Sequence, residues 1–376
     1  MLVMLALLAV ASFVGAAVLS LLQVLPPVAP QHLALAAGVM PLIVGAMTHF
    51  VPVLSRSSAP HFGIRLIPLL MLVAGALVFF SFAESNQAYL FAAYLALAAA
   101  AVFAAWIVRR AGRAVGKPHP CLDWYLAAIA CLILALVAVI AMAWWPEQHQ
   151  ALKRLHLHLN TLGFIGLTAV ATLQLLMPTV LGRPDPQAAA RLRQHLKWAL
   201  GGTLLVAMGA AWFKPLAYPG IVLWMVPLLQ LGRAWATLYL REIFRFNGAA
   251  SSLAAAYTGL VAVLLFGALH AHDILNPMDS TLAFILVFLL PLVTGAVSQL
   301  LPIWIHPGMQ TNWHAQVRQK LGAGGGYRAM LFLLGGLLVA TGWCSGLLFS
   351  IAALILFLLQ LAATIRGHVI NRTPGQ

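Results

Sequence analysis

The stretch His32–Pro52, HLALAAGVMPLIVGAMTHFVP, has counterparts at His158–Pro178, HLNTLGFIGLTAVATLQLLMP, and at Leu282–Pro302, LAFILVFLLPLVTGAVSQLLP. Each stretch is apolar, is helix-length and ends in a proline. A small residue lies seven positions before each proline: Gly45, Ala171 or Gly295. The prolines follow one another at intervals of 126 and 124 residues. This spacing indicates a structural unit used three times, and two of its three copies begin with a histidine.

The composition around these stretches is that of a membrane protein. Hydrophobic residues make up 63% of the 376 residues and charged residues 7%, and the mean hydropathy is +0.97. A soluble domain needs far more charge to cover its surface. Apolar runs of about 20 residues recur along the chain, each long enough to cross the hydrocarbon core. They do not alternate as barrel strands do, so the sequence predicts an all-α polytopic membrane protein.

We expect about 12 transmembrane helices in a single integral membrane domain, residues 1–376. The predicted spans are 2–22, 31–54, 64–83, 88–110, 122–145, 155–181, 194–213, 217–240, 249–270, 281–305, 327–343 and 346–366. Three repeats of four helices would then cover approximately residues 1–115, 116–245 and 246–376. The repeated proline-containing stretch would be the second helix of each repeat.

Loop charge predicts the orientation, because basic residues concentrate in cytoplasmic loops. Alternate loops and the C-terminal tail hold Arg56, Arg65, Arg109, Arg110, Arg113, Lys117, Arg183, Arg191, Arg193, Lys197, Arg241, Arg245, Arg318, Lys320, Arg328, Arg366 and Arg372. The opposite side holds Lys153, Arg154 and Lys214. We therefore expect both termini in the cytoplasm and the chain in the cell (inner) membrane. This pattern and anionic lipid of the bilayer explain the net charge of +14, and we expect no nucleic-acid partner.

Cysteine and carboxylate chemistry have little support in the sequence. Cys121, Cys131 and Cys344 form no CxxC pair, which argues against a disulfide framework or a thiolate metal site. The chain has seven acidic residues in total, too few for a carboxylate metal cage or a long proton wire.

Histidines are the unusual polar feature of the sequence. His32, His149, His156, His158, His270 and His272 are all predicted at one depth on the outer side. Ionisable side chains at membrane depth are costly, and neutral imidazole is a common metal ligand, so we predict a heme or metal site there. The alternative is that each is an interfacial histidine bonded to a loop carbonyl. His49, His61, His119, His195, His306, His314 and His368 are predicted on the cytoplasmic side, in structural or headgroup-level roles.

Helical geometry limits which outer histidines can share a site. His156 and His158 are two residues apart and diverge by about 200° on a regular helix, so both cannot face one metal. The repeat favours His158, because it matches His32 in its distance from the proline. In the third copy Leu282 replaces the histidine, so His270 or His272 is the candidate for the missing ligand. Asp273 and Asp279 could orient a ligating imidazole, or Asp279 could cap the next helix with Ser280.

The chain resembles the catalytic subunit of heme–copper oxidases and, in size and pattern, NnrS-type membrane proteins. The similar segments begin HLALAAGVMPLIVGAMTHF at His32, HLHLNTLGFIGLTAVATLQ at His156 and LVFLLPLVTGAVSQLLP at Leu286. The resemblance implies the oxidase-subunit-I-like fold with heme and/or copper as cofactors. It also implies a link to nitric oxide or respiratory metabolism, with a respiratory or metal-delivery partner. We expect cofactor binding at His32, His156, His158, His270 and His272, and direct metal ligation at all of these except His156.

The sequence departs from the oxidase pattern in two helices. The oxidases carry an adjacent His–His pair on their seventh helix and two histidines on the tenth. Here the seventh predicted helix has only His195, and the tenth has no internal histidine. A complete proton-pumping terminal oxidase is therefore excluded, and whether the chain is an enzyme stays open. The alternative function is a cofactor-free transporter or a structural or assembly protein on the same scaffold.

Overall fold

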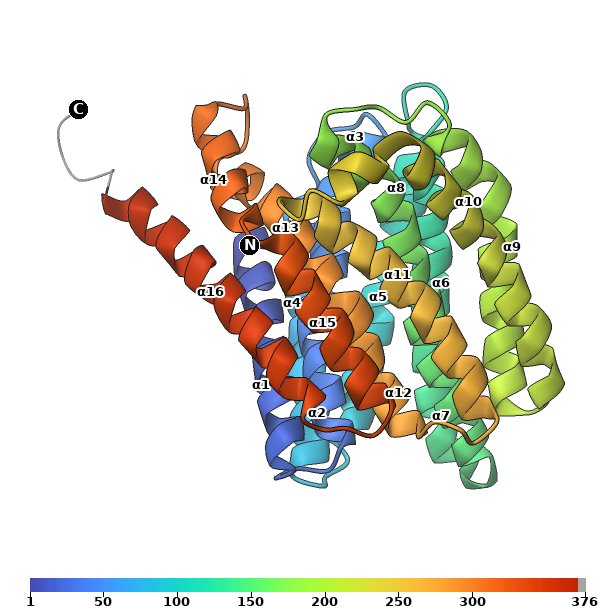
Figure 1. Ribbon diagram of the computed structural model, residues 1–376. Coiled ribbons are helices and arrows are strands. Elements are labelled where there is room, and N and C mark those ends of the chain that lie inside the picture. Colours follow the sequence, from blue (N-terminus) through green and yellow to red (C-terminus); the bar gives the residue numbers. More distant parts are fainter. Residues whose placement is uncertain (371–376) are drawn as a thin grey trace. The chain divides into compact units, whose positions relative to one another are not determined.

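The computed structural model describes residues 1–370, with side chains through Thr364, and its regular elements over that range are all helices (Figure 1). Arg372 lies outside the described residues, and so do the side chains of Arg366 and His368. The chain divides into two compact units. Unit 1 comprises Met1–Pro178 and Arg183–Ala234, and unit 2 comprises Thr179–Gly182 and Trp235–Gln376.

Unit 1 combines uninterrupted α-helices with helices that contain π-helical or 3-10 turns. Its elements are α1 (Leu2–Leu22), α2 (Val28–His32), η1 (Leu33–Val39), α3 (Met40–Leu54), α4 (Phe62–Ala83), α5 (Ala88–Gly112), α6 (Cys121–Trp144), η2 (Pro146–Gln148), α7 (His149–His158), η3 (Leu159–Leu167), α8 (Thr168–Leu181), α9 (Ala188–Ala211) and η4 (Lys214–Leu216). The last three residues of α8 belong to unit 2, and α10 (Ala217–Ile243) passes from unit 1 to unit 2. Unit 2 continues with α11 (Ala249–Ala271), α12 (Pro277–Ala283), η5 (Phe284–Leu289), α13 (Leu290–Ile305), α14 (Asn312–Gly322), α15 (Gly325–Ala340) and α16 (Gly346–Ile370).

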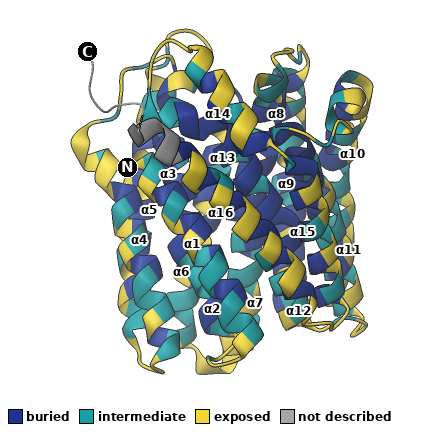
Figure 2. Ribbon diagram, turned by 60° about the vertical axis from the view of Figure 1, so that its left-hand side comes forward, coloured by how far each residue is buried: buried dark blue, intermediate teal, exposed yellow. Residues whose placement is uncertain are grey.

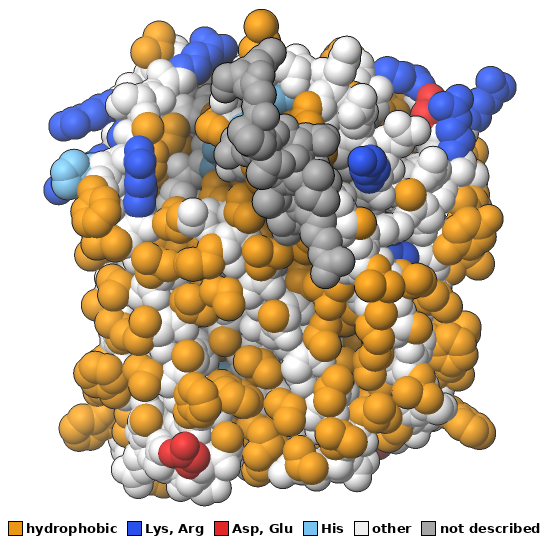
Figure 3. Space-filling view, turned by 90° about the vertical axis from the view of Figure 1, so that its left-hand side faces the viewer, with side chains coloured by type: hydrophobic (Ala, Val, Ile, Leu, Met, Phe, Trp, Pro, Cys, Tyr) orange, Lys and Arg blue, Asp and Glu red, His pale blue; other side chains and the backbone are white. Residues whose placement is uncertain are grey.

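The helices confirm a polytopic membrane architecture. Among the described residues, eleven helical segments are long and apolar enough to cross a membrane. The predicted seventh helix, α9, is 24 residues long but is not among the eleven. In Figure 3, hydrophobic side chains cover the middle of the face shown, and most Lys and Arg side chains gather near one end. Such a distribution suits a bilayer flanked by headgroups.

The start of one predicted helix and the whole of another helix were wrongly predicted as loop, because their residues are polar. The sixth predicted span, 155–181, begins in the structure at Pro146, so His149 starts α7 and is not in a loop. The helix α14 was predicted as loop, although it joins α15 in a segment from Asn312 to Ala340 with a two-residue break. In both places Gln, Lys and Arg carry the polarity, and these residues form helices readily.

The three proline-containing stretches share an unusual helical turn. Each contains a π-helix, and η1, η3 and η5 lie at closely similar distances before Pro52, Pro178 and Pro302. In a π-helix each N–H bonds to the carbonyl five residues earlier, and such turns often occur at functional positions. In the first and third stretches a proline, Pro41 or Pro291, is the second residue of the α-helix that follows. Proline lacks the N–H that an α-helix needs at that position, which favours a change of hydrogen-bond register just before it.

The same three stretches are the most buried helices of their units. Buried residues make up 67% of the apolar window in Val28–Leu54, 67% in Pro146–Leu181 and 78% in Pro277–Ile305. In the other candidate spans the share is 28–50%. Figure 2 shows buried residues along α13, with exposed residues on α16 of the same unit. These three helices therefore form the interior of their units, while their neighbours face outward.

Glycines allow neighbouring helices to approach these π-helices closely. In unit 1, a Cβ added to Gly75 of α4 would lie 2.1 Å from the carbonyl oxygen of Ala36 in η1. In unit 2, a Cβ on Gly259 of α11 would lie 1.9 Å from the carbonyl oxygen of Val287 in η5, and one on Gly336 of α15 would meet the Val287 side chain at 2.3 Å. Small residues at such crossings are how membrane helices pack without a hydrophobic driving force.

Candidate metal-binding site

His32 is the last residue of α2, at the point where the helix changes to the π-helix η1. Its Nδ1 lies 2.8 Å from the carbonyl oxygen of Val28, four residues earlier, and the residue is half-buried. A carbonyl oxygen can only accept a hydrogen bond, so Nδ1 must carry the proton and donate it. In the neutral ring the lone pair is then on Nε2. Metal-ligating histidines commonly bind in this way, with one ring nitrogen hydrogen-bonded to the protein and the other available as the ligand atom.

Two aromatic rings lie in a row beside His32. Phe82 of α4 lies with its ring centroid 4.7 Å from that of His32, and Tyr89 of α5 stacks on Phe82 at 6.0 Å. The contact with Phe82 limits rotation of the imidazole about its side-chain bonds. The ring of His32 is therefore held from two sides, by the Val28 carbonyl and by Phe82.

His156 and His158 lie in the last turn of α7, which packs against α6 and α9. The Nδ1 of His158 lies 2.8 Å from the carbonyl oxygen of Arg154, which repeats the four-residue arrangement of His32 and Val28. The Nδ1 of His156 lies 3.0 Å from the carbonyl oxygen of Ala135 on α6. The argument for His32 applies to both, so each of the three rings donates from Nδ1. The amide of Asn160 lies 3.5 Å from Nε2 of His156.

The ends of α2 and α7 lie at the same end of unit 1, opposite α3 and α8 (Figures 1 and 2). His32 and His156 are close enough to interact electrostatically, and Lys153 is also within that range of His32. Asn160, at the start of η3, donates from its amide to the carbonyl oxygen of His156 at 2.9 Å. The structure thus brings together His32 from the first stretch and His156 from the helix before the second.

The donor set fits a metal held by one or two imidazoles. Among the described residues, no group of three His, Cys, Asp or Glu side chains could hold a metal ion. Two imidazoles suffice for a bis-histidine heme or a two-coordinate copper(I), and imidazole suits both iron and copper. Because Nδ1 of His32, His156 and His158 is bonded to a carbonyl oxygen, Nε2 is the nitrogen through which any of these rings could bind a metal.

His270 and His272 lie in unit 2, at the end of α11. His270 is half-buried in the last turn, and His272 is exposed as the residue that follows the helix. Asp273, next along the chain, adopts a left-handed backbone conformation with φ of 58°. The suggestion that Asp279 caps the next helix is wrong, because the cap of α12 is Asn276, whose side chain accepts the Met278 N–H at 2.8 Å.

On the predicted cytoplasmic side, His314 has a structural role. Its Nδ1 accepts the backbone N–H of Thr311 at 3.0 Å, and its Nε2 donates to the carbonyl oxygen of His306 at 2.9 Å. Both ring nitrogens are used, and the side chain is buried within a capping box at the start of α14. This histidine has no nitrogen left for a metal.

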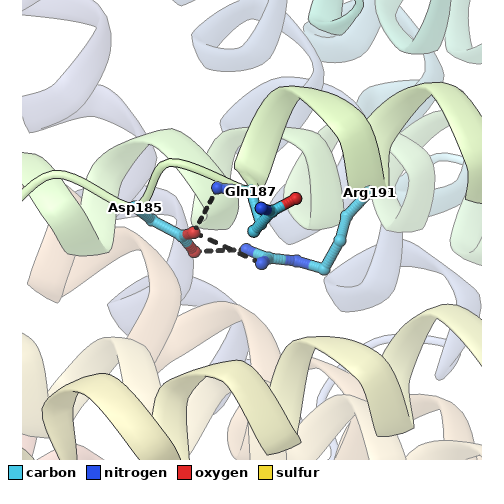
Figure 4. Close-up of polar contacts among 3 residues, drawn as sticks. All are labelled: Asp185, Gln187 and Arg191. Atoms are coloured by element: carbon cyan, nitrogen blue, oxygen red, sulfur yellow. Dashed lines mark hydrogen bonds and ion pairs between the residues drawn. The ribbon is translucent and has the colours of Figure 1, made fainter.

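The acidic side chain of Asp185 is also structural. It forms an ion pair with Arg191 at the start of α9 and accepts the backbone N–H of Gln187 at 3.0 Å (Figure 4). The side chains of Asp185 and Arg191 are only 2% and 12% exposed. The pair therefore fixes the turn between α8 and α9 and does not offer a carboxylate to a ligand.

Three contacts of the site were missed by the sequence. The carbonyl of Ala135 carries no sequence signal, since every residue has a carbonyl. Phe82 is one of 18 phenylalanines, with nothing to mark it. Asn160 could have been noticed, because it lies four residues after His156 and so on the same helical face.

Comparison with known proteins does not assign the chain to a family. A scan against protein-family models gave no match, and a search of curated proteins gave no similar sequence. The functional interpretation of the chain therefore rests on its own residues.

Proposed function

We propose that the chain is a heme- and/or copper-binding membrane protein whose cofactor is held by imidazoles at the outer end of unit 1. The observation that carries this proposal is the hydrogen bonding of His32, His156 and His158, each of which commits Nδ1 to a carbonyl oxygen. This bonding makes Nε2 the nitrogen that would bind a metal, from His32 and from one of His156 and His158. The cofactor would supply one-electron redox chemistry or binding of a diatomic gas such as nitric oxide.

His32 is the principal ligand in this proposal. Its ring is held on two sides, by the Val28 carbonyl and by Phe82, and it begins the first proline-containing stretch. His156 is the partner that the electrostatic proximity favours, whereas the repeat spacing favours His158. The divergence of about 200° between His156 and His158 means that only one of them shares a metal with His32.

The proposed scaffold is three repeats of four helices, similar to the heme–copper oxidase subunit. Three features support it: the spacing of Pro52, Pro178 and Pro302, the π-helix before each, and the high burial of all three stretches. We propose the inner membrane as its location, with both termini cytoplasmic because of the loop charges. A respiratory or metal-delivery protein on the outer side is the proposed partner.

Purified protein tests the proposal directly. Cells supplied with heme and copper should yield protein with a Soret absorption band, or with metal by elemental analysis. The signal should disappear in His32→Ala and weaken in one of His156→Ala or His158→Ala. His61→Ala is the matched control, because His61 is an exposed histidine whose ring only caps α4.

Colourless, metal-free wild-type protein that elutes as a single folded species would refute the proposal. That result would favour the cofactor-free transporter or assembly protein. Loss of signal in His61→Ala as well would show that the signal does not come from the outer histidines.

A further inference from the structure

Three cations without an anionic partner lie at the arginine-rich end of unit 1. They are Arg56 after α3, Lys117 before α6 and Arg193 on α9, and all three are exposed. In the part of the chain that the structure describes, none of them forms an ion pair or a side-chain hydrogen bond, and Asp123 at the start of α6 is not paired with any of them. Arg110, by contrast, donates to loop carbonyl oxygens at 3.0 and 3.3 Å. The three charges are therefore available to a ligand.

The three cations meet at one short loop. A Cβ added to Gly116 would lie 3.9 Å from Nη1 of Arg56, so this guanidinium lies beside the residue that precedes Lys117. Two residues beyond Lys117, His119 is close enough to Arg193 to interact electrostatically. The end of α3, the loop before α6 and the start of α9 thus bring three positive charges together.

Arg56 occupies a backbone conformation that favours glycine. It lies in the turn four residues after Pro52, with a φ of 51°. The corresponding residue four positions after Pro178 is Gly182, with a φ of 61°. In both turns the next residue donates its N–H to the carbonyl oxygen of the proline, at 2.9 and 3.1 Å. Because glycine forms this turn without strain, the arginine adds nothing to it except a guanidinium.

Exposed apolar side chains flank the cations. Val53 is 64% exposed and lies three residues before Arg56, and Val115 is 68% exposed and lies two residues before Lys117. A soluble phosphate would use the cations alone, whereas a phospholipid presents a phosphate with acyl chains beside it. Positive charge next to exposed apolar surface is therefore the arrangement that an anionic amphiphile fits.

From this arrangement we infer that Arg56, Lys117 and Arg193 bind the phosphate headgroup of an anionic phospholipid in the leaflet at that end of unit 1. The cations hold the phosphate oxygens through charge-assisted hydrogen bonds, and Val53 and Val115 contact the acyl chains. This lipid site is independent of the proposed cofactor. It assigns particular residues where the loop charges by themselves gave only an orientation.

Lipid titration of the delipidated protein tests the site. Protein in nonionic detergent is titrated with phosphatidylglycerol or with phosphatidylcholine, and bound phospholipid is counted by native mass spectrometry. Both lipids carry a phosphate, but only phosphatidylglycerol has a net negative charge. Wild type should prefer phosphatidylglycerol by about 30-fold, from about threefold for each of three exposed cations. Salt should reduce that preference, because exposed charges are screened.

Variants then assign the preference to residues. Arg56→Gly, Lys117→Met and Arg193→Met should each reduce it by about threefold, and the triple variant should bind the two lipids equally. Arg56→Gly should leave the unfolding midpoint nearly unchanged, because glycine adopts the left-handed conformation readily. Lys320→Met is the matched control, since Lys320 is an exposed cation of unit 2 on the same predicted side, and it should retain the full preference.

Competition by inorganic phosphate separates a lipid from a soluble ligand. The lipid should stay bound, because free phosphate lacks the apolar contacts. Displacement of the lipid by phosphate would overturn the assignment, since the site would then recognise phosphate alone. Equal binding of the two lipids by wild type would overturn it too. So would a preference that the triple variant keeps, or one that Lys320→Met reduces as much as Lys117→Met does.

Discussion

Replacing Gly75 by alanine should disturb the support of His32 from the neighbouring helix. Gly75 is buried on α4, and its added Cβ would lie 2.1 Å from the Ala36 oxygen and 2.4 Å from the Ala36 carbonyl carbon. Ordinary contact begins at 3.4 Å, so α4 must retreat by about 1.3 Å (3.4 − 2.1). Phe82, seven residues later on the same face, would move away from the ring of His32.

The net energy follows from two opposing terms. Overpacking a close helix contact costs about 1–3 kcal/mol, and here the obstacle is backbone that cannot swing aside. Alanine returns about 0.5–1 kcal/mol, because it favours the helix more than glycine does. We therefore expect Gly75→Ala to lose about 1–2 kcal/mol, which corresponds to a midpoint lowered by about 2–8 °C. The larger side chain of Gly75→Val should cost more.

The buried cysteines provide the assay. Cys121 and Cys131 of unit 1 are 0% and 1% exposed, so a fluorogenic maleimide reacts with them only on unfolding. The exposed Cys344 is first replaced by serine. Gly112→Ala is the control, since no atom lies within 4 Å of its added Cβ. If Gly75→Ala unfolds at the same temperature as Gly112→Ala, the close approach of α4 and η1 is wrong.

Three further predictions concern charged and titrating groups. Arg328→Met should lower the free energy of unfolding, measured by SDS titration, by about 2–4 kcal/mol. The reason is that the buried guanidinium donates to two carbonyl oxygens at the end of α14. Lys320→Met, at an exposed site, is the control and should change the stability little. Burial lowers the pKa of His119 in the loop before α6. The unfolded chain therefore binds the proton more readily than the folded chain. The stabilisation should be complete above about pH 6.5 and should fall as the pH drops toward the lowered pKa. In thermal melts at pH 7.5 and 5, His119→Asn should show a smaller difference in midpoint than wild type. Asp185→Asn or Arg191→Met should each cost about 3 kcal/mol, and the double variant less than their sum; additive losses would contradict a buried pair.

Much of the fold was predictable because hydropathy is a local property. The first predicted helix, 2–22, coincides with α1, and the third, 64–83, differs from α4 by two residues at its start. Errors occurred where helices leave the apolar region, as at Pro146 and in α14, because hydropathy alone does not separate a polar helix from a loop. The π-helices were not predicted, because a shift of hydrogen bonding by one residue leaves hydropathy unchanged.

Some features of the candidate site were likewise predictable from the sequence, and others depend on tertiary packing. Topology alone suggested that His32, His156 and His158 share one end, and the bonds of His32 and His158 to carbonyls four residues earlier follow from helix geometry. The choice of Ala135 as the partner of His156 depends on how α6 packs against α7. Cofactor binding stays a prediction that the experiments above decide, and the repeat origin of the scaffold stays a prediction as well.

The sequence by itself determined the membrane class, the approximate spans and the positions of the prolines and histidines along them, because apolar length and residue type act along the chain. Only the tertiary structure decided which ring nitrogen of His156 is committed, that Phe82 lies against His32, and that Gly75 touches the backbone of η1. The physical reason is that every residue offers the same carbonyl and the same backbone surface. Only the packing of helices from distant parts of the sequence selects which of them meets a given side chain.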